Sequence, residues 1–358
     1  MGGHDLSTAP AEREKRDLIA QMPKAELHLH LDGSLRPATA LALARERGLD
    51  AGMDLAAMAA RLQAPAQCKD QAELLAAFDL PIAILQDAEA LYRAAYELVE
   101  DIASDGTRYV EIKWGPLLHV QGGLGMADGI AAVAAGTRDA AAATGVVARL
   151  VAVALRSHPP DANVVMVRTA AQFIDQGLTG FDLAGLEAAY PDPLAHARSF
   201  EVAREAGLGI TIHAGEWGGA AQVRRSLEAV SPARIAHGAS AAEDPALMAD
   251  LAARGVTLDI CPTSNVQAAD FPSLADFPLR TLLDAGVPLT LSTDDRTVSD
   301  LTLVREYQNA IDFMGVGVAD LWAMNMHALR VAFLAHEEAT RSRLMGEFEA
   351  YAAFESAL

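Results

Sequence analysis

The residues best suited to chemistry in this chain are histidines and acidic residues at the ends of short apolar runs. His28 and His30 are separated by one residue in such a run. Side chains two apart in a β-strand point to the same face, so both imidazoles are expected to converge on one point. Neutral imidazole is the commonest nitrogen ligand of zinc, which makes the pair a candidate metal site. The alternative is a pair of core histidines with ordinary hydrogen-bond partners.

Three further runs end in ionisable groups. One carries His213 and, three residues later, Glu216; the next ends in His237; the third ends in Asp294 and Asp295. Each run alone is weak evidence, because His-Gly steps and Asp-Asp pairs often form turns or caps. Taken together they point to a shared site, because burying so many ionisable groups would be costly without a metal or partners.

The elements that must position these groups are short apolar runs, often β-branched, that alternate with Ala-rich stretches of helical periodicity. We expect strands over residues 25–31, 109–114, 146–155, 178–183, 208–213, 234–237, 256–260 and 288–292. We expect helices over residues 129–143, 193–206, 221–229, 244–254 and 277–285. Strands that alternate with helices form parallel βαβ units, and eight such units in one chain predict an α/β fold, the (β/α)8 TIM-type barrel.

The alternative fold is a doubly wound open sheet, which favours a Gly-rich phosphate loop after the first strand. The first strand is followed instead by Leu31-Asp32-Gly33. In a barrel, the carboxyl ends of all the strands share the face on which active sites are built. The ionisable groups fall at such strand ends, so the barrel explains their spacing.

Two stretches fall outside the simple alternation. Residues 36–105 form a long helical insertion between the first and second strands, with amphipathic spacing over 71–85 and 90–102. It would lie at the mouth of the barrel, either as a lid or as extra packing. Residues 300–355 are expected to be helices that complete the barrel. We predict a flexible tail over residues 1–10 and a single domain over 11–358.

Composition excludes several classes of protein. The chain has 358 residues and a formal net charge of -20, with no run of Lys or Arg, which argues against a nucleic-acid partner. Its two cysteines are far apart and suggest no disulfide framework. We find neither a signal peptide nor a stretch that could span a membrane, and therefore expect a cytoplasmic protein. The sequence predicts no oligomeric state.

The donor set favours one metal ion. Catalytic zinc takes three or four protein ligands and keeps a position for water. The nitrogen ligands would be His28, His30 and His213. Adjacent strand residues face opposite sides, so only one of Asp294 and Asp295 is expected to reach the ion. Binuclear barrel hydrolases usually have a bridging Lys on the fourth strand, and residues 180–185 contain none. Lys113, on the second strand, is expected to be structural.

The motifs His-x-His-x-Asp-Gly, His-Ala-Gly-Glu, His-Gly, Cys-Pro-x-Ser-Asn and Ser-Thr-Asp-Asp occur in this order. With them the chain closely resembles the adenosine deaminase family, from about Lys24 to the C-terminus. The resemblance implies a (β/α)8 barrel with one zinc ion per chain. It also implies a small-molecule partner, a purine nucleoside, with adenosine or 2′-deoxyadenosine hydrolysed to inosine or 2′-deoxyinosine and ammonia, a reaction of purine salvage.

The resemblance also implies roles for individual residues. Glu216 matches the proton donor to the purine ring, and His237 and Asp295 match the pair that orients and helps to deprotonate the attacking water. The implied zinc ligands are His28, His30, His213 and Asp294. The implied substrate contacts are His30, Asp32, Gly185 and Asp295.

Three departures from the family pattern lie near these motifs. Leu186 replaces an acidic residue, Arg296 stands where many members have Pro, and Trp217 is larger than its usual counterpart. Asp32 matters for the substrate, because related adenine deaminases usually carry Glu there. It favours a nucleoside over adenine or a modified nucleoside such as aminodeoxyfutalosine, which remain the alternatives.

Other functions are less well supported by the motifs. An inactive relative should have lost a ligand or the proton donor, yet all seven implied metal-binding and catalytic groups are present. A general barrel amidohydrolase is disfavoured by His-Ala-Gly-Glu and by the fourth strand without Lys. The zinc deaminases of cytidine and nucleic-acid bases use H-x-E with P-C-x-x-C, which Cys68 and Cys261 cannot provide.

Overall fold

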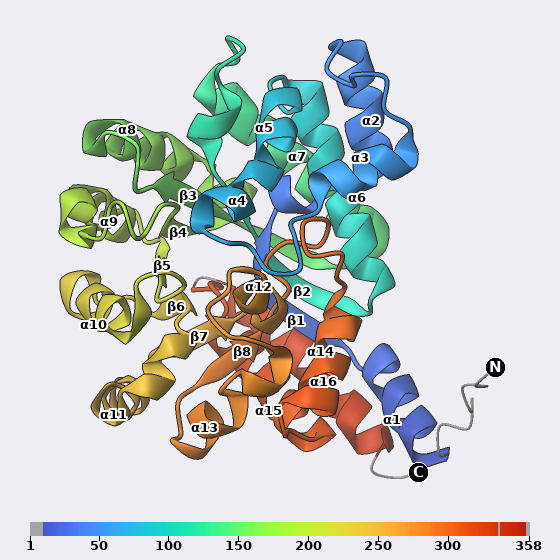
Figure 1. Ribbon diagram of the computed structural model, residues 1–358, viewed down its shortest axis with the longest axis vertical. Helices are drawn as coiled ribbons and strands as arrows, with labels where there is room; N and C mark the ends of the chain where they lie inside the picture. Colours follow the sequence, from blue (N-terminus) through green and yellow to red (C-terminus); the bar gives the residue numbers. More distant parts are fainter. Residues whose placement is uncertain (1–9, 336, 356–358) are drawn as a thin grey trace.

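Eight parallel strands form the centre of the molecule. The computed structural model describes residues 10–335 and 337–355. Neighbouring strands follow chain order around the sheet, and a backbone bridge between Leu29 and Asp294 brings its two edges together (Figure 1). The strands are β1 (Lys24–His30), β2 (Thr107–Trp114), β3 (Val147–Leu155), β4 (Leu178–Ala184), β5 (Gly209–Ala214), β6 (Arg234–His237), β7 (Thr257–Ile260) and β8 (Leu289–Leu291). The predicted (β/α)8 barrel is confirmed, and the predicted tail lies almost wholly outside the described residues.

Helices surround the strands in a ring (Figure 1). They are α1 (Pro10–Gln21), α2 (Pro37–Glu46), α3 (Leu55–Leu62), α4 (Gln71–Leu75), α5 (Asp79–Ile84), α6 (Ala88–Ser104), α7 (Met126–Thr144), α8 (Pro160–Ala170), α9 (Ala197–Glu205), α10 (Gly219–Val230), α11 (Pro245–Arg254), α12 (Pro262–Gln267), α13 (Leu279–Asp284), α14 (Leu303–Phe313), α15 (Val318–Val331) and α16 (Glu338–Glu355). The predicted helices all occur, and α1, α8 and α12 lie outside the predicted ranges.

Two predicted helices are interrupted. The stretch 193–206 begins as a 3₁₀ turn, Pro193–His196, and continues as α9. The stretch 71–85 is divided into α4, a 3₁₀ turn at Ala76–Phe78, and α5. Pro81 explains this second break, because proline lacks an N–H and is tolerated only in the first turn of a helix. In α5 it occupies that first turn.

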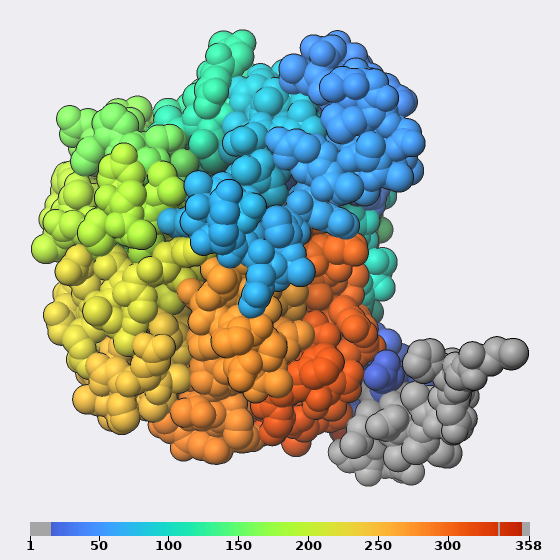
Figure 2. Space-filling model, viewed as in Figure 1, coloured from blue at the N-terminus to red at the C-terminus, as the bar shows by residue number. Residues whose placement is uncertain are grey.

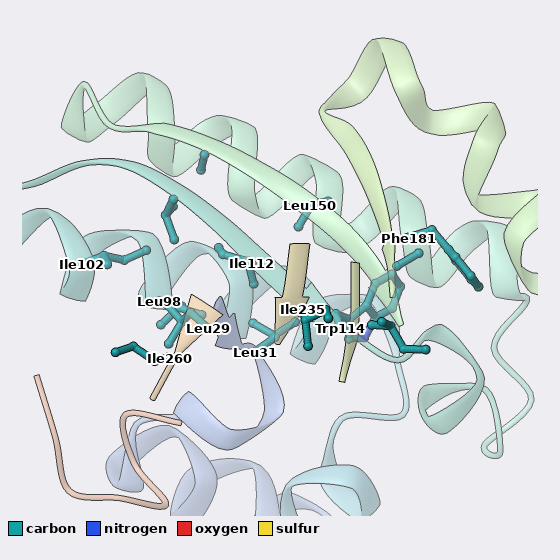
Figure 3. Close-up of a cluster of buried hydrophobic side chains, with 14 of the residues drawn as sticks. Leu29, Leu31, Leu98, Ile102, Ile112, Trp114, Leu150, Phe181, Ile235 and Ile260 are labelled. Atoms are coloured by element: carbon teal, nitrogen blue, oxygen red, sulfur yellow. The ribbon is translucent and has the colours of Figure 1, made fainter. Parts of the chain in front are cut away.

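The strands present polar side chains to the barrel interior and apolar side chains to the helices. In β1, Ala25 and Leu27 pack with buried residues of α15 and α16, whereas Glu26 and His28 alternate with them and are also buried. Figure 3 shows the apolar layer between strands and helices, where Leu29 and Ile112 lie near Leu98 of α6. Each such buried side chain contributes about 1.5–3 kcal/mol to folding.

Three buried charged side chains inside the barrel form one paired group. The fully buried Arg234 donates to Asp259 at 2.9 Å and also to Glu111. This pairing offsets the cost of removing three charges from water, since a buried charge without a partner is strongly destabilising. Its three members come from β2, β6 and β7. These strands are thereby tied together inside the barrel.

The insertion reaches across the mouth of the barrel, as expected. Cys68 donates its N–H to Gln267 O at 2.7 Å, and Ala64 donates its N–H to Val298 O at 3.0 Å. In Figure 2 this blue segment covers the middle of the visible face and borders the orange surface. Both cysteines are buried and free. Among the described residues, no helix has the length and apolarity to cross a membrane.

Candidate active site

Three imidazoles and one carboxylate meet at the carboxyl ends of the strands. The Nε2 atoms of His28, His30 and His213 lie 3.1–3.2 Å from one another. Asp294 Oδ1 lies 2.9 Å from Nε2 of His28 and 3.3 Å from Nε2 of His30. The first two histidines come from β1, the third from β5, and Asp294 follows β8. The structure therefore brings together ligands from three distant stretches of the sequence.

This arrangement fits a cation. Four ligands at about 2.0–2.1 Å from a tetrahedral zinc ion stand roughly 3.3 Å apart, close to the observed spacing. Burial lowers the pKa of His28 and lowers that of His213 to about 3, so both imidazoles are neutral and able to coordinate. Neutral imidazoles that point Nε2 at Nε2 cannot all donate to one another. The four residues form a candidate metal site with three nitrogen donors and one oxygen donor.

Asp294 reaches this site because the strand has already ended. β8 stops at Leu291, and Asp294 has the left-handed φ of 66°. The alternation of strand faces does not apply to Asp294 and Asp295, and both side chains line the same cavity. Only Asp294 is among the four candidate ligands, in agreement with the expectation that one of the two aspartates reaches the ion. Ser264 donates its hydroxyl to Asp294 Oδ2 at 2.7 Å and fixes the carboxylate.

A second carboxylate lies behind His213. Asp182 Oδ2, on β4, is 3.0 Å from His213 Nδ1 and 2.7 Å from Lys113 Nζ on β2. Burial would raise the pKa of Asp182, but the imidazole and the ammonium outweigh it and hold the pKa well below its usual range. The carboxylate favours a proton on Nδ1 and leaves Nε2 free for a metal. Lys113 is structural, as expected, but the sequence analysis gave Asp182 no role, although its place near the end of β4 was a signal.

We expect Asp182→Asn to weaken metal binding about 10–100-fold, the usual effect of removing such a carboxylate. The amide cannot match the charge that Lys113 and His213 share with the carboxylate. Competition with a chelator of known affinity measures the change. Asp175→Asn, at an exposed position before β4, is the matched control and should bind metal as the unchanged protein does. Equal affinities in the two variants would remove Asp182 from this role.

A cavity of about 260 Å³ lies in front of the four ligands. Its wall includes Asp32, Gly185, Glu216, His237, Asp294 and Asp295, together with His30 and His213. The insertion supplies a further part of the wall through Gln71, Leu74, Leu75, Phe78, Asp79 and Ile82. The insertion thus borders the site and does more than extend the packing. All the residues that the resemblance singled out except the buried His28 line this one cavity.

Glu216 is held on a loop that a buried acid organises. Glu187 accepts hydrogen bonds from the N–H groups of Gly215, Trp217 and Gly218 at 2.7–3.0 Å. Burial raises the pKa of Glu216 well above its ordinary value, and the nearby Asp294 carboxylate adds to the rise. This environment favours the protonated form of the Glu216 carboxyl. The sequence analysis missed the part that Glu187 plays.

Asp295 is buried close to the backbone of Gly33, just after β1. A Cβ atom on Gly33 would stand only 1.7 Å from Asp295 Oδ1, so a side chain at position 33 would displace this carboxylate. Burial raises the pKa of Asp295, with Asp294 the next cause. Its Oδ1 is buried and has no hydrogen-bond partner among the described residues. A water or substrate group that donates a proton would satisfy it.

Asp32 is a buried residue of the same cavity lining. His119 Nε2 lies 3.7 Å from Asp32 Oδ2. Burial would raise the pKa of Asp32, but the His119 imidazole outweighs it, so the net shift is downward. Asp32 is therefore an ionised acceptor beside the ligands, suited to a hydroxyl donor.

The three departures from the family pattern have different places in the structure. Leu186 lines the cavity. Trp217 packs against the insertion in a small cluster with Cys68 and Leu74. Arg296 forms an ion pair with Asp105 and is not among the residues that line the cavity. Leu186 is thus the departure placed to contact a ligand.

Comparison with known proteins gives the same family. A model of the adenosine deaminase family matches residues 23–349. The chain belongs to the adenosine deaminase family. An adenosine deaminase from Mycobacteroides abscessus is 36% identical over 338 residues, which cover 89% of this chain and 92% of that protein. One from Enterococcus faecalis is 33% identical over 320 residues, covering 89% and 94%.

Solved structures with a similar fold agree with this architecture. An adenine deaminase from Arthrobacter aurescens has 26% identity and a TM-score of 0.84, covering 93% of this chain and 99% of that one. A zinc-bound amidohydrolase from Burkholderia ambifaria has 26% identity and a TM-score of 0.85, covering 99% and 97%. The N6-methyl-AMP deaminase from Arabidopsis thaliana has 26% identity and a TM-score of 0.81, covering 94% and 98%.

Proposed function

We propose that this chain hydrolyses the 6-amino group of adenosine and 2′-deoxyadenosine, giving the inosine product and ammonia. The observation that carries the proposal is the convergence of His28, His30, His213 and Asp294 beside a cavity that Glu216, a carboxyl with a raised pKa, also lines. Hydrolysis of an aromatic amine needs an activated water and a proton for the ring. This cavity offers groups for both tasks.

We propose one zinc ion per chain, held by the three imidazoles and Asp294. A zinc ion bound there would lower the pKa of a water from about 15.7 toward 7 and so make hydroxide available at neutral pH. The three-nitrogen, one-oxygen donor set is typical of zinc and unlike the oxygen cages of calcium or magnesium. The zinc-bound relative of the same fold supports the choice of ion.

The chain's own groups divide the remaining work. Asp295 has a buried oxygen without a hydrogen-bond partner among the described residues, which suits a group that positions a water and accepts its proton. His237 lines the same cavity and would share that task. Glu216, kept neutral by burial, would donate a proton to N1 of the purine as the ring loses its aromatic character. Gly185 would bind a ring nitrogen through its backbone, and His30, Asp32 and Asp295 would contact the substrate.

The cavity favours a nucleoside over a nucleotide. Among the described residues, its lining contains no lysine and no arginine but includes Asp32, Asp79, Glu216, Asp294 and Asp295. A phosphate group entering it would lose water without gaining a cation to pair with. This observation separates the proposal from the nucleotide substrate in the name of the Arabidopsis relative. Adenine and modified adenine nucleosides remain the second candidates, because a solved relative of the same fold is an adenine deaminase.

Replacing Asp32 by alanine is expected to raise KM for adenosine more than for adenine. The Asp32 carboxylate is an ionised acceptor in the cavity lining. A hydrogen bond from the substrate to this charged group would contribute about 1.5–3 kcal/mol, roughly a 10- to 150-fold change in affinity. The absorbance change on deamination gives KM for both substrates. Asp79→Ala, a second acid of the lining, is the control. An equal rise in KM for adenine and for adenosine would show that Asp32 does not contact the sugar.

A substrate panel on metal-analysed protein tests the whole proposal. Adenosine, 2′-deoxyadenosine, adenine, aminodeoxyfutalosine, AMP and cytidine would be compared by kcat/KM, with zinc measured in the same preparation. We expect adenosine and 2′-deoxyadenosine to lead and AMP to be poor. A protein that holds zinc yet deaminates none of the adenine compounds would overturn the proposed function. Preference for adenine or aminodeoxyfutalosine would change the substrate and keep the chemistry.

A further inference from the structure

His237 can serve as a base only in one of its two neutral forms. Its ring is almost fully buried at the end of β6, edge-on to the His28 and His213 rings with centroids 4.9 and 5.2 Å away. Its Nε2 lies 3.8 Å from Asp294 Oδ2 and 3.9 Å from Glu216 Oε2, on the side of the cavity. A neutral imidazole has one protonated nitrogen and one acceptor nitrogen. Nε2 can accept a proton only if the hydrogen is on Nδ1.

Asn265 contacts the other nitrogen. Asn265 lies on α12 and is fully buried, with Oδ1 3.4 Å from His237 Nδ1. An amide can offer an oxygen that accepts or an N–H that donates, depending on which way it is turned. In the first case the hydrogen is on Nδ1 of His237; in the second it is on Nε2. The orientation of this amide therefore decides which nitrogen of His237 is free.

Asp270 decides how the amide is turned. Asn265 donates Nδ2–H to Asp270 Oδ2 at 2.9 Å, and Asp270 donates its own N–H to Asn265 O at 3.0 Å. Ala269, between α12 and Asp270, has a left-handed φ of 62° that turns the chain back toward Asn265. Burial raises the pKa of Asp270 to about 8, while the Asn265 amide opposes that rise. The ionised carboxylate has no donor, so in that form it requires the Nδ2–H of Asn265 on its side, as in the observed contact.

We propose that Asp270 and Asn265 are positioning residues that hold His237 with its hydrogen on Nδ1 and its Nε2 lone pair toward the cavity. Asp270 accepts from the amide nitrogen, so Asn265 Oδ1 is left to accept from His237. Neither residue is among the described residues that line the cavity, and Asn265 reaches it through His237. Asp270 also adds to the raised pKa of Glu216, so the protonation pattern of His237, rather than kcat alone, decides the inference. The benefit to catalysis rests on the proposed function, but the protonation pattern of the ring does not.

The first test is spectroscopic and needs no turnover. Long-range ¹H–¹⁵N spectra of the zinc-loaded protein distinguish protonated from unprotonated ring nitrogens, and loss of a signal in His237→Gln assigns this ring among the ten histidines. We expect a protonated Nδ1 and an unprotonated Nε2. A proton on Nε2 in the unchanged protein would overturn the inference at once.

The second test breaks the chain of hydrogen bonds from Asp270 through Asn265 to His237 and then restores it. Asp270→Asn lets the neighbouring amide turn either way and should mix the two forms of His237. We expect kcat to fall at least about tenfold, part of the 10²–10⁴ that proton transfer supplies, with KM and zinc content unchanged. The double change Asn265→Asp with Asp270→Asn reverses donor and acceptor between the two positions while keeping an acceptor toward His237. It should restore the Nδ1 form and most of kcat.

The matched control is Asp276→Asn, which removes a similar acceptor from Ser273 on the exposed turn that follows. It should leave the spectrum and kcat unchanged. If Asp270→Asn lowers kcat without altering the His237 signals, or if the double change rescues neither, the two residues only support the loop and the inference fails. If the spectra are as expected but no adenine compound is deaminated, the proposed function fails, while the positioning of His237 by Asn265 and Asp270 is supported.

Discussion

Replacing Glu216 by glutamine is expected to lower kcat at least about 100-fold while leaving zinc in place. Glutamine has nearly the same shape but cannot release a proton to the purine ring, and general acid catalysis supplies about 10²–10⁴-fold. Glu216 is not one of the four ligands, so the metal site should be unaffected. Steady-state kinetics with metal analysis of the same sample would measure both effects.

The raised pKa of Glu216 also predicts how activity changes with pH. Burial is the largest cause of the raised pKa of Glu216, and the Asp294 carboxylate is the second. A cation bound by Asp294 would weaken the second of these contributions and leave the effect of burial. The donor must be protonated, so activity should be full below its pKa and decline as pH rises through it. In Glu216→Gln that alkaline decline should be absent from the residual activity. Glu243→Gln, a change of the same kind outside the cavity lining, should retain normal kcat and profile. Near-normal turnover in Glu216→Gln would exclude Glu216 as the donor.

Replacing His213 by alanine is expected to remove metal and activity together. The change deletes one of three nitrogen ligands and leaves the Asp182 and Lys113 pair without the imidazole that it holds. Two nitrogens and one carboxylate would remain, one ligand fewer than the tetrahedral set described above. We expect less than about a tenth of the zinc to remain after dialysis and kcat to fall by at least about 10³-fold, because a metal-activated water supplies the nucleophile.

The control for His213 is another histidine in a hydrogen bond. His327→Ala removes a contact with Thr257 at 2.9 Å and should keep its zinc. Circular dichroism of both variants would check that the barrel still folds. Full zinc occupancy in His213→Ala would contradict its assignment as a ligand, whatever happened to activity.

The sequence predicted the fold because each of its signals is local. Strand side chains repeat every two residues and helical ones every 3.6, so apolar runs mark each βα unit without knowledge of its neighbours. All eight strands are found within two residues of their predicted bounds. The metal ligands were also accessible to this reasoning, because parallel strands place their carboxyl ends on one face. The predicted ranges left out α1, α8 and α12. The predicted helical stretch 71–85 is divided near Pro81.

The positions around the ligands required the tertiary structure. Nothing in the local sequence of β4 says that Asp182 lies behind His213, because the contact joins residues 31 positions apart on neighbouring strands. Asp294 and Asp295 share one cavity only because a left-handed residue follows the end of β8, which a regular strand pattern cannot express. Glu187 and the Asp270–Asn265 pair organise groups far from them in the chain. Residue types and spacing thus determined the chemistry, whereas long-range packing decided which polar groups orient it, since hydrogen-bond geometry depends on through-space positions that no local pattern encodes.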